Sequence, residues 1–378
     1  MQANFRLQMF LFCSKNEVMS PPSRNAPVSA PGRAARSNRG GRFEAHEREI
    51  LHDGWDIPED IPKLRTEVST ERPRQVITRN MSPDISFDRS INSYRGCEHG
   101  CIYCFARPTH AFLGLSPGLD FETRLIARPE APAVLERELR SRSYRPDTIA
   151  IGTNTDPYQP IERNYRIMRR ILEVLLAYRH PVAVVTKGTL IERDIDILSE
   201  MATLGLVRVG ISVTTLDNRI SRLMEPRVPL PERRLETIRR LSAAGIPVRV
   251  MASPVVPALT DHELEGILKQ GAEAGAAAAS WIMLRLPLEV APLFREWLEA
   301  HFPDRAKRVM GRVRDLHGGR DYDPEWGKRM TGEGPFADLV AHRFAIATRR
   351  LGLAEELPPL RTDLFRPPPR AGDQLELF

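Results

Sequence analysis

Short apolar runs alternate with amphipathic stretches from about residue 88 onward. The runs are rich in Val, Ile and Thr, which favour strands, and the stretches between them repeat apolar residues with the period of a helix that covers a sheet. The pattern predicts strands at 90–94, 148–152, 182–186, 207–212, 248–253 and 280–286. It predicts helices at 131–141, 161–178, 192–204, 231–244, 261–274 and 292–301. Such alternation is typical of βα units around a parallel sheet.

The order of these elements predicts an α/β fold, an open partial (β/α)6 barrel rather than a closed eight-stranded one. Right-handed crossovers would place the helices outside and the C-terminal ends of all strands on one functional rim. We assign this barrel to residues 88–302. A chain of 378 residues with 42% hydrophobic content is long enough to bury one core of that size.

The segments next to the barrel are also expected to be ordered. Residues 61–87 form a lead-in segment, and residues 303–355 form a helical C-terminal extension. Within that extension, helical patterns at 305–316 and 336–351 enclose a Gly-rich, aromatic segment at 318–334.

Both ends of the chain are predicted to be disordered tails. Residues 1–60 form a basic N-terminal tail, because 20–42 contains Pro, Ser, Gly and Arg but no acidic residue. Residues 356–378 form a flexible, Pro-rich tail. The composition changes at Met19, which indicates that translation begins there and would remove Cys13.

The formal charge of +6 suits an anionic partner such as DNA. Only six of the 55 basic residues are lysines, however, and an arginine excess beside many Ala and Pro also follows from genomic base composition. Charge alone therefore supports nucleic-acid binding only weakly.

The cysteine pattern and the lack of long apolar runs indicate a cytoplasmic protein. Three of the four cysteines lie within eight residues, which is unlike a secreted disulfide framework and typical of a metal site in a reducing compartment. The apolar runs are much shorter than the ~20 residues of a membrane span. The stretch at 10–13 is too short for a signal peptide. We expect no membrane partner.

The three clustered cysteines predict an iron–sulfur site. Cys97, Cys101 and Cys104 follow the first expected strand, on a loop at the functional rim. Three thiolates on a four-iron cubane leave one iron open to a substrate or cofactor. Gly96 and Gly100 allow the tight turns with which one short loop contacts three corners of the cube. A zinc site with His99 or His110 as the fourth ligand is the alternative, although zinc ligands usually come in closely spaced pairs.

This cysteine spacing, with Tyr103 before the last cysteine, resembles the signature of the radical S-adenosylmethionine superfamily. The resemblance extends over about 77–353 and is closest to the spore-photoproduct-lyase-like branch, often labelled DNA repair photolyase. Further matching landmarks lie at 82–84, 105–110, 155–160, 186–187, 212–215, 225–226 and 254–257.

The resemblance implies two cofactors, a 4Fe-4S cluster and S-adenosyl-L-methionine. The open iron would bind the amino and carboxylate groups of the methionine portion. One electron, from a donor such as flavodoxin or ferredoxin, would then generate a 5′-deoxyadenosyl radical that abstracts hydrogen. The protein would contribute positioning and the exclusion of water.

The resemblance also implies cofactor contacts at the ends of successive strands. Tyr103 would border the adenine, and Thr153 to Asp156 would contact the methionine amine. Lys187 would neutralise the carboxylate, and Ser212 would hydrogen-bond the ribose. Each position has a structural alternative: a packed aromatic ring, an Asx-turn before Pro157, a solvated strand end and a helix or turn cap, respectively.

Two strand arginines require a partner, because an unpaired charge inside a barrel is costly. Arg249 and Arg285 lie in the fifth and sixth expected strands. Arg285 is expected to face cofactor or substrate, with Glu225 as an alternative structural partner.

The chain departs from the spore-specific lyase in one respect. That enzyme has an additional cysteine near the second strand, which returns hydrogen to the repaired thymine, whereas 149–153 has none here. The substrate is therefore expected to be another nucleic-acid lesion, a tRNA base, a peptide or a small molecule. A non-catalytic iron–sulfur or zinc protein that binds DNA is the alternative from a different class. No second cysteine group is present for an auxiliary cluster.

The last five residues, Gln374, Leu375, Glu376, Leu377 and Phe378, resemble the peptide by which bacterial DNA polymerases and repair proteins bind the sliding clamp. A Gln would hydrogen-bond the rim of a groove, and the Leu and Phe side chains would be apolar anchors on a Pro-rich tether. The alternative is a terminal segment that folds back onto the barrel.

Overall fold

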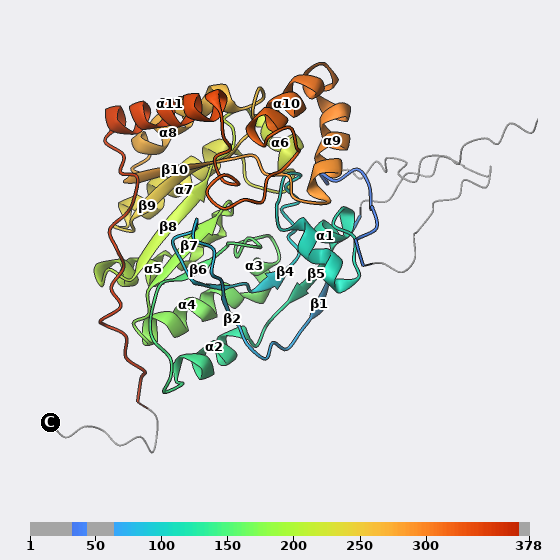
Figure 1. Cartoon of the computed structure of the whole chain (residues 1–378). Helices are drawn as coiled ribbons and strands as arrows, with labels where there is room; N and C mark the ends of the chain where they lie inside the picture. The colour runs from blue at the N-terminus through green and yellow to red at the C-terminus, as the bar shows by residue number, and fades with distance from the viewer. Residues whose placement is uncertain (1–31, 44–63, 370–378) are drawn as a thin grey trace, which may run out of the picture.

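A computed structural model describes residues 32–43 and 64–369 of the chain (Figure 1). Its central sheet has the strand order β10-β9-β8-β7-β6-β3-β2. The strands are β2 (Ile77–Arg79), β3 (Arg89–Ile91), β6 (Ile149–Ile151), β7 (Val182–Thr186), β8 (Val207–Ser212), β9 (Val248–Val255) and β10 (Ala278–Met283). All neighbours pair in parallel except β2, which is antiparallel to β3 at the edge. The sheet is open, and the predicted six parallel strands of a partial barrel are confirmed.

Helices follow the parallel strands along the chain, as predicted. They are α2 (Ala131–Leu139), α3 (Glu162–Tyr165), α4 (Ile167–Ala177), α5 (Ile195–Thr203), α6 (Asn218–Met224), α7 (Pro231–Ala243), α8 (Leu264–Glu273) and α9 (Val290–His301). Short 3-10 helices lie at η1 (Arg107–Leu113), η2 (Thr189–Asp194) and η3 (Asp261–Glu263). The extension contributes α10 (Pro303–Leu316) and α11 (Pro335–Leu351), and α11 packs on α8. No helix in the described ranges is both long and apolar enough to cross a membrane.

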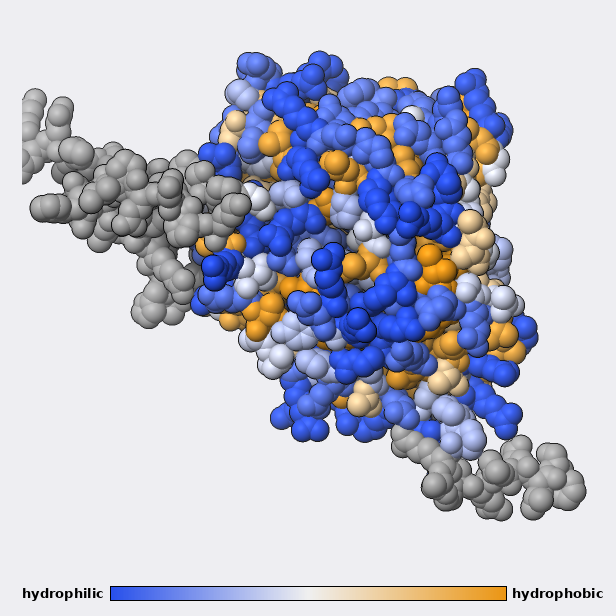
Figure 2. All heavy atoms as spheres, turned by 180° about the vertical axis from the view of Figure 1, so that it is seen from behind, coloured by the Kyte–Doolittle hydropathy of each residue, from blue (hydrophilic) through white to orange (hydrophobic). Residues whose placement is uncertain are grey.

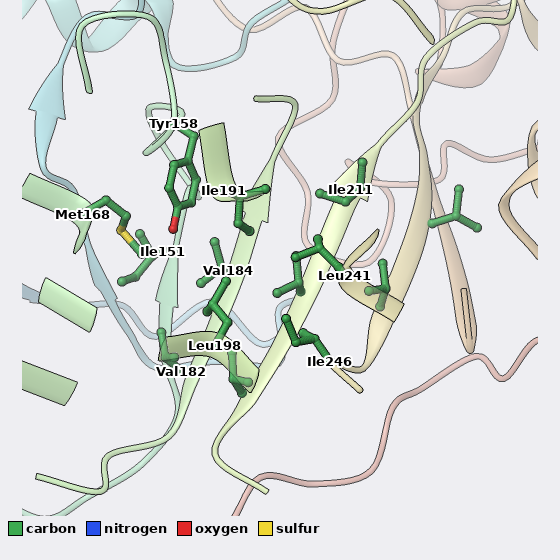
Figure 3. Packing of buried hydrophobic residues seen from close by; sticks show 14 of the residues in the cluster. Ile151, Tyr158, Met168, Val182, Val184, Ile191, Leu198, Ile211, Leu241 and Ile246 are labelled. Atoms are coloured by element: carbon green, nitrogen blue, oxygen red, sulfur yellow. The ribbon is translucent and has the colours of Figure 1, made fainter. Parts of the chain in front are cut away.

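The main core lies between the sheet and these helices (Figure 3). Along β7, Val182 and Val184 are buried among helix residues such as Leu198. The alternate residue Val185 faces the opposite side of the sheet, where it borders a cavity. The period-two alternation of a strand thus separates core residues from cavity residues. On the face seen in Figure 2, apolar side chains are interspersed among hydrophilic ones.

The expected helix at 161–178 is interrupted at Arg166, which has a left-handed φ of 51°. The cause is the buried Glu162 carboxylate, which accepts hydrogen bonds from the backbone N–H groups of Ile167 and Met168. The same carboxylate accepts a bond from the hydroxyl of Tyr94. Glu162 therefore caps the second helix and links it to the strand before the cysteine loop.

A second, three-stranded sheet supports the cysteine loop and was not predicted. It has the order β1-β5-β4, with β1 (Glu67–Thr70), β4 (Tyr94–Arg95) and β5 (Arg124–Ala127), next to α1 (Leu119–Thr123). Its strands contain at most four residues, which is too few for a hydrophobic alternation to stand out in the sequence.

The prediction of a disordered tail over 1–60 requires a correction. Residues 32–43 lie against the domain, where Ala34 and Ala35 are buried and donate backbone hydrogen bonds to the Glu122 carboxylate at 3.2 and 3.0 Å. The Arg33 guanidinium donates to the carbonyl of Glu122 at 2.8 Å. Glu122, which is buried and distant in sequence, thus holds a segment whose composition is typical of disordered regions. The rest of that range, with Cys13 and Met19, lies outside the described residues.

The prediction of a flexible tail over 356–378 needs a similar correction. Phe365 packs against Tyr144, Tyr178 and His180, and the backbone N–H of Arg366 donates to the carbonyl of Tyr178 at 3.0 Å. Residues 356–369 therefore form a strap along the domain, visible as the dark red trace in Figure 1. The clamp-like peptide lies outside the described residues.

Candidate cofactor site

A cavity opens at the C-terminal ends of the parallel strands and encloses about 870 Å³, including the space at its open mouth. All the site residues predicted from the sequence border it: Cys97, Cys101, Tyr103, Cys104, Thr153, Asp156, Lys187, Ser212 and Arg285. They come from the cysteine loop and from the ends of β6, β7, β8 and β10. Residues far apart in the sequence are thus brought to one functional rim, as a parallel sheet requires.

Glycines give the cysteine loop its tight turns, as predicted. Gly96 and Gly100 have φ values of 72° and 66°. A side chain on Gly100 would start 2.6 Å from a carboxylate oxygen of Glu122. The backbone N–H of Cys97 donates to the carbonyl of Phe121 at 2.9 Å, which ties the loop to α1.

Arg107 is the internal support of this loop. Its fully buried guanidinium donates to the carbonyls of Gly100 at 2.9 Å and Cys101 at 3.0 Å. It also pairs with the fully buried Glu122 carboxylate at 2.5 Å. Glu122, which accepts the backbone hydrogen bonds of Ala34 and Ala35, therefore also anchors the cysteine loop through Arg107.

The three thiols have the chemistry that an iron–sulfur cluster requires. Burial raises the pKa of Cys97, Cys101 and Cys104, so each thiolate needs nearby positive charge, which iron supplies. Within 32–43 and 64–369, no three His, Cys, Asp or Glu side chains converge so as to hold a single ion. Thiols that each bind a different iron of a cubane need not converge on one point. The residues therefore fit a cluster better than the zinc alternative.

The loop after β6 is fixed by the Asp156 carboxylate. It accepts hydrogen bonds from the backbone N–H of Tyr158 at 2.9 Å, which forms the Asx-turn considered above, and from that of Lys187 at 2.8 Å. His99 Nδ1 lies 3.4 Å from a carboxylate oxygen of Asp156. Burial opposes ionisation of Asp156, but His99 and the hydrogen bonds from the Lys187 backbone and the Thr186 hydroxyl bring its pKa down to about 2. Asp156 thus borders the cavity as an anion that already has several partners.

Gly152, at the start of that loop, has a φ of 92°. A side chain there would start 1.9 Å from the carbonyl oxygen of Val185. Only glycine allows this close approach of β6 and β7, which brings Thr153 and Lys187 to the same cavity.

A chain of buried contacts positions Tyr103 and Lys187. The Lys187 ammonium lies 5.7 Å from the ring centroid of Tyr103. The Tyr103 hydroxyl donates to the Glu225 carboxylate, which accepts another bond from Thr214 at 2.6 Å. Glu225 pairs with Arg234 at 2.8 Å, and both are fully buried. The alternative that Glu225 is the structural partner of Arg285 is therefore wrong.

The other polar residues have simpler surroundings. The Ser212 hydroxyl donates to the Ser253 carbonyl at 2.9 Å, which joins the ends of β8 and β9. Arg249 donates to the carbonyl of Glu355 at 2.9 Å and does not border the cavity. Arg285 lies just beyond β10, with its guanidinium 4.4 Å from the ring centroid of Phe105.

Several cavity residues were not predicted as cofactor contacts: His99, Phe105, Gly152, Val185, Met251, Ser253, Pro254, Ile282 and Met283. Most of them lie in or just beyond the C-terminal halves of strands, whereas His99 and Phe105 lie on the cysteine loop, where Phe105 directly follows Cys104. The apolar members resemble core residues in sequence, because a cavity wall and a core have the same pattern.

Comparison with known proteins gives an independent result. The family model of the Radical SAM superfamily matches residues 91–271. An uncharacterized protein of Mycobacterium tuberculosis is 38% identical over 263 residues, which cover 69% of this chain and 76% of that protein. An uncharacterized protein of Methanocaldococcus jannaschii is 24% identical over 57% of this chain and 76% of its own length.

Solved structures share the fold. A cysteine-to-alanine mutant of spore photoproduct lyase with dinucleoside spore photoproduct has a TM-score of 0.54 at 15% identity, over 76% of this chain and 80% of that one. The same lyase complexed with dinucleoside spore photoproduct has a TM-score of 0.51 at 15% identity, over 76% and 81% of the two chains.

Proposed function

This chain belongs to the radical S-adenosylmethionine superfamily, and we propose that it cleaves S-adenosylmethionine reductively to abstract hydrogen from a nucleic acid. The observation that carries this proposal is the convergence of three cluster-type cysteines and the expected cofactor residues on one cavity. Bound together, the 4Fe-4S cluster and S-adenosylmethionine supply a 5′-deoxyadenosyl radical.

The residues of the chain bind and orient these groups. Cys97, Cys101 and Cys104 would hold the 4Fe-4S cluster through their thiolates and leave a coordination position for the cofactor. Lys187 pairs with the cofactor carboxylate, and Tyr103, held by Glu225, borders the adenine. The apolar side chains around them exclude water from the reaction.

Thr153, Asp156 and Ser212 take the remaining cofactor contacts. Asp156 attracts the methionine ammonium by its charge while its hydrogen bonds keep the loop after β6 in place. Thr153 lies on that loop, and Ser212 accepts a bond from a ribose hydroxyl while it donates to Ser253.

Substituting Lys187 with alanine is expected to weaken binding of S-adenosylmethionine about 10- to 100-fold, because it removes a charge-assisted contact. Iron content stays the same, since the ammonium is not a cluster ligand. Equilibrium dialysis and iron analysis of the reconstituted protein measure both. Lys269→Ala, an exposed lysine paired with Glu273, is the matched control. Equal cofactor affinity in the two variants would contradict the role of Lys187.

Two features of the chain support a DNA substrate. Its net charge is +6, and its last five residues have the form of a clamp-binding peptide. The strap places the start of the tether, near Arg366, beside Tyr178 at the C-terminal end of α4. Structures with the same fold also include a lyase complexed with a dinucleoside photoproduct.

Removal of residues 374–378 is expected to abolish binding to the bacterial sliding clamp without loss of cofactor cleavage. The truncation removes the Gln and the apolar anchors but leaves Phe365 of the strap in place. Surface plasmon resonance on immobilised clamp compares the two proteins. Equal binding by both, or binding by neither, would remove this support for DNA.

The proposed activity is tested by anaerobic reconstitution with iron and sulfide, followed by dithionite and S-adenosylmethionine. We expect 5′-deoxyadenosine and methionine in equal amounts. An intact cluster without 5′-deoxyadenosine would favour the non-catalytic alternative.

A further inference from the structure

Arg285 is a partly buried cation at the cavity without an acidic partner. It borders the cavity, and burial lowers the pKa of its guanidinium. The fully buried arginines Arg107 and Arg234 each pair with a carboxylate, Glu122 and Glu225 respectively. In the described parts of the chain, no carboxylate lies within 4.0 Å of Arg285. An arginine on a cavity wall that has no acid of its own is available to an anionic ligand, so Arg285 indicates one.

The residues before and after Cys104 are aromatic, and a different cation lies against each of their rings. The Lys187 ammonium lies 5.7 Å from the Tyr103 ring, and the Arg285 guanidinium lies 4.4 Å from the Phe105 ring. S-adenosylmethionine has a single carboxylate, and its ammonium and sulfonium groups are positive. With Lys187 assigned to that carboxylate, Arg285 remains for an anion from another molecule.

The surroundings of Arg285 suit a nucleotide. The Phe105 side chain is 44% exposed although it borders the cavity, so part of its ring is free for contact with a planar group. Tyr322, Arg329 and Asp84 lie in the same neighbourhood. Arg329 is already neutralised by Asp84 at 2.6 Å, which leaves Arg285 as a cation available to substrate there.

We propose that Arg285 and Phe105 form the substrate subsite of the cavity, in which Arg285 binds the phosphodiester beside the reacting nucleotide and Phe105 stacks on a base. This inference rests on the proposed function. A guanidinium matches two phosphate oxygens at once, and aromatic rings bind unstacked bases of any sequence. The subsite therefore selects a nucleotide with its backbone charge rather than a free base.

The test uses the full-length reconstituted holoenzyme with S-adenosylmethionine, under anaerobic conditions. Its ligands are a thymidine dinucleotide with the natural phosphodiester and the same dinucleotide with a neutral methylphosphonate link. The wild type is expected to bind the charged ligand about 10- to 100-fold more tightly. Arg285→Gln is expected to bind both equally, whereas Arg249→Gln, an arginine away from the cavity, keeps the preference.

A second variant tests the ring. Phe105→Leu is expected to weaken the binding of both dinucleotides about 10-fold. The preference for the phosphodiester remains, because stacking on a base does not depend on the charge of the linkage. Retention of the preference in Arg285→Gln would overturn the inference, whether or not that variant also loses iron. Binding of neither ligand by a wild type that produces 5′-deoxyadenosine would overturn it as well. Absence of 5′-deoxyadenosine in the wild type would instead reject the proposed function.

Discussion

Alanine at Cys97, Cys101 or Cys104 is expected to reduce iron from about four per chain to near zero and to eliminate 5′-deoxyadenosine formation. Each thiolate holds a different corner of the cubane, so the loss of one exposes a further iron to solvent and oxidation. Cys97 and Cys101 are buried and Cys104 is partly buried, and burial raises the pKa of each thiol. The loop therefore holds thiolates only when iron compensates them.

Iron and sulfide analysis, visible absorbance and product chromatography on the reconstituted variants measure this effect. Cys13→Ala is the matched control, since Cys13 lies outside the cysteine loop and should leave both cluster and activity unchanged. A full cluster absorbance in any of the three loop variants would refute the assignment.

Arg107→Met is expected to lower the free energy of unfolding by about 3–5 kcal/mol, because it leaves the Glu122 carboxylate buried without its cation. The same change removes the hydrogen bonds that hold the carbonyls of Gly100 and Cys101. Yield of reconstituted cluster should therefore fall together with stability.

Denaturant unfolding of the anaerobic apo-protein measures the stability change. Arg72→Met is the matched control, because Arg72 pairs with Glu130 at 2.7 Å on the surface, where an ion pair contributes little. Equal stability of the two variants would show that the buried pair does not support the loop.

The sequence predicted the parts of the fold that depend on local patterns. The strands at 182–186 and 207–212 have the predicted bounds, because each is a continuous β-rich run between clear helices. The break at Arg166 was missed, since the Glu162 carboxylate that caps the next helix is also bound by Tyr94 from a strand far away in the chain. Residues 32–43 were missed for the same reason, because Glu122 holds them across a long separation in sequence.

The predicted site residues border one cavity, but the sequence predicted neither the rest of its lining nor the pairings of its charged groups. Strand ends in a parallel sheet meet at one rim, so residues such as Lys187 and Ser212 could be placed together from topology. Which acid pairs with which base depends on side-chain packing. Glu225 binds Arg234 and Tyr103 rather than Arg285, and that choice has no signature in the sequence.

We propose that the three cysteines hold a cluster whose fourth iron binds S-adenosylmethionine. Electron paramagnetic resonance of the dithionite-reduced, reconstituted protein tests it most directly. We predict that S-adenosylmethionine changes the g values of the reduced cluster, and that Lys187→Ala shows the same change only at higher cofactor concentration. A spectrum that saturating cofactor leaves unchanged would contradict the claim.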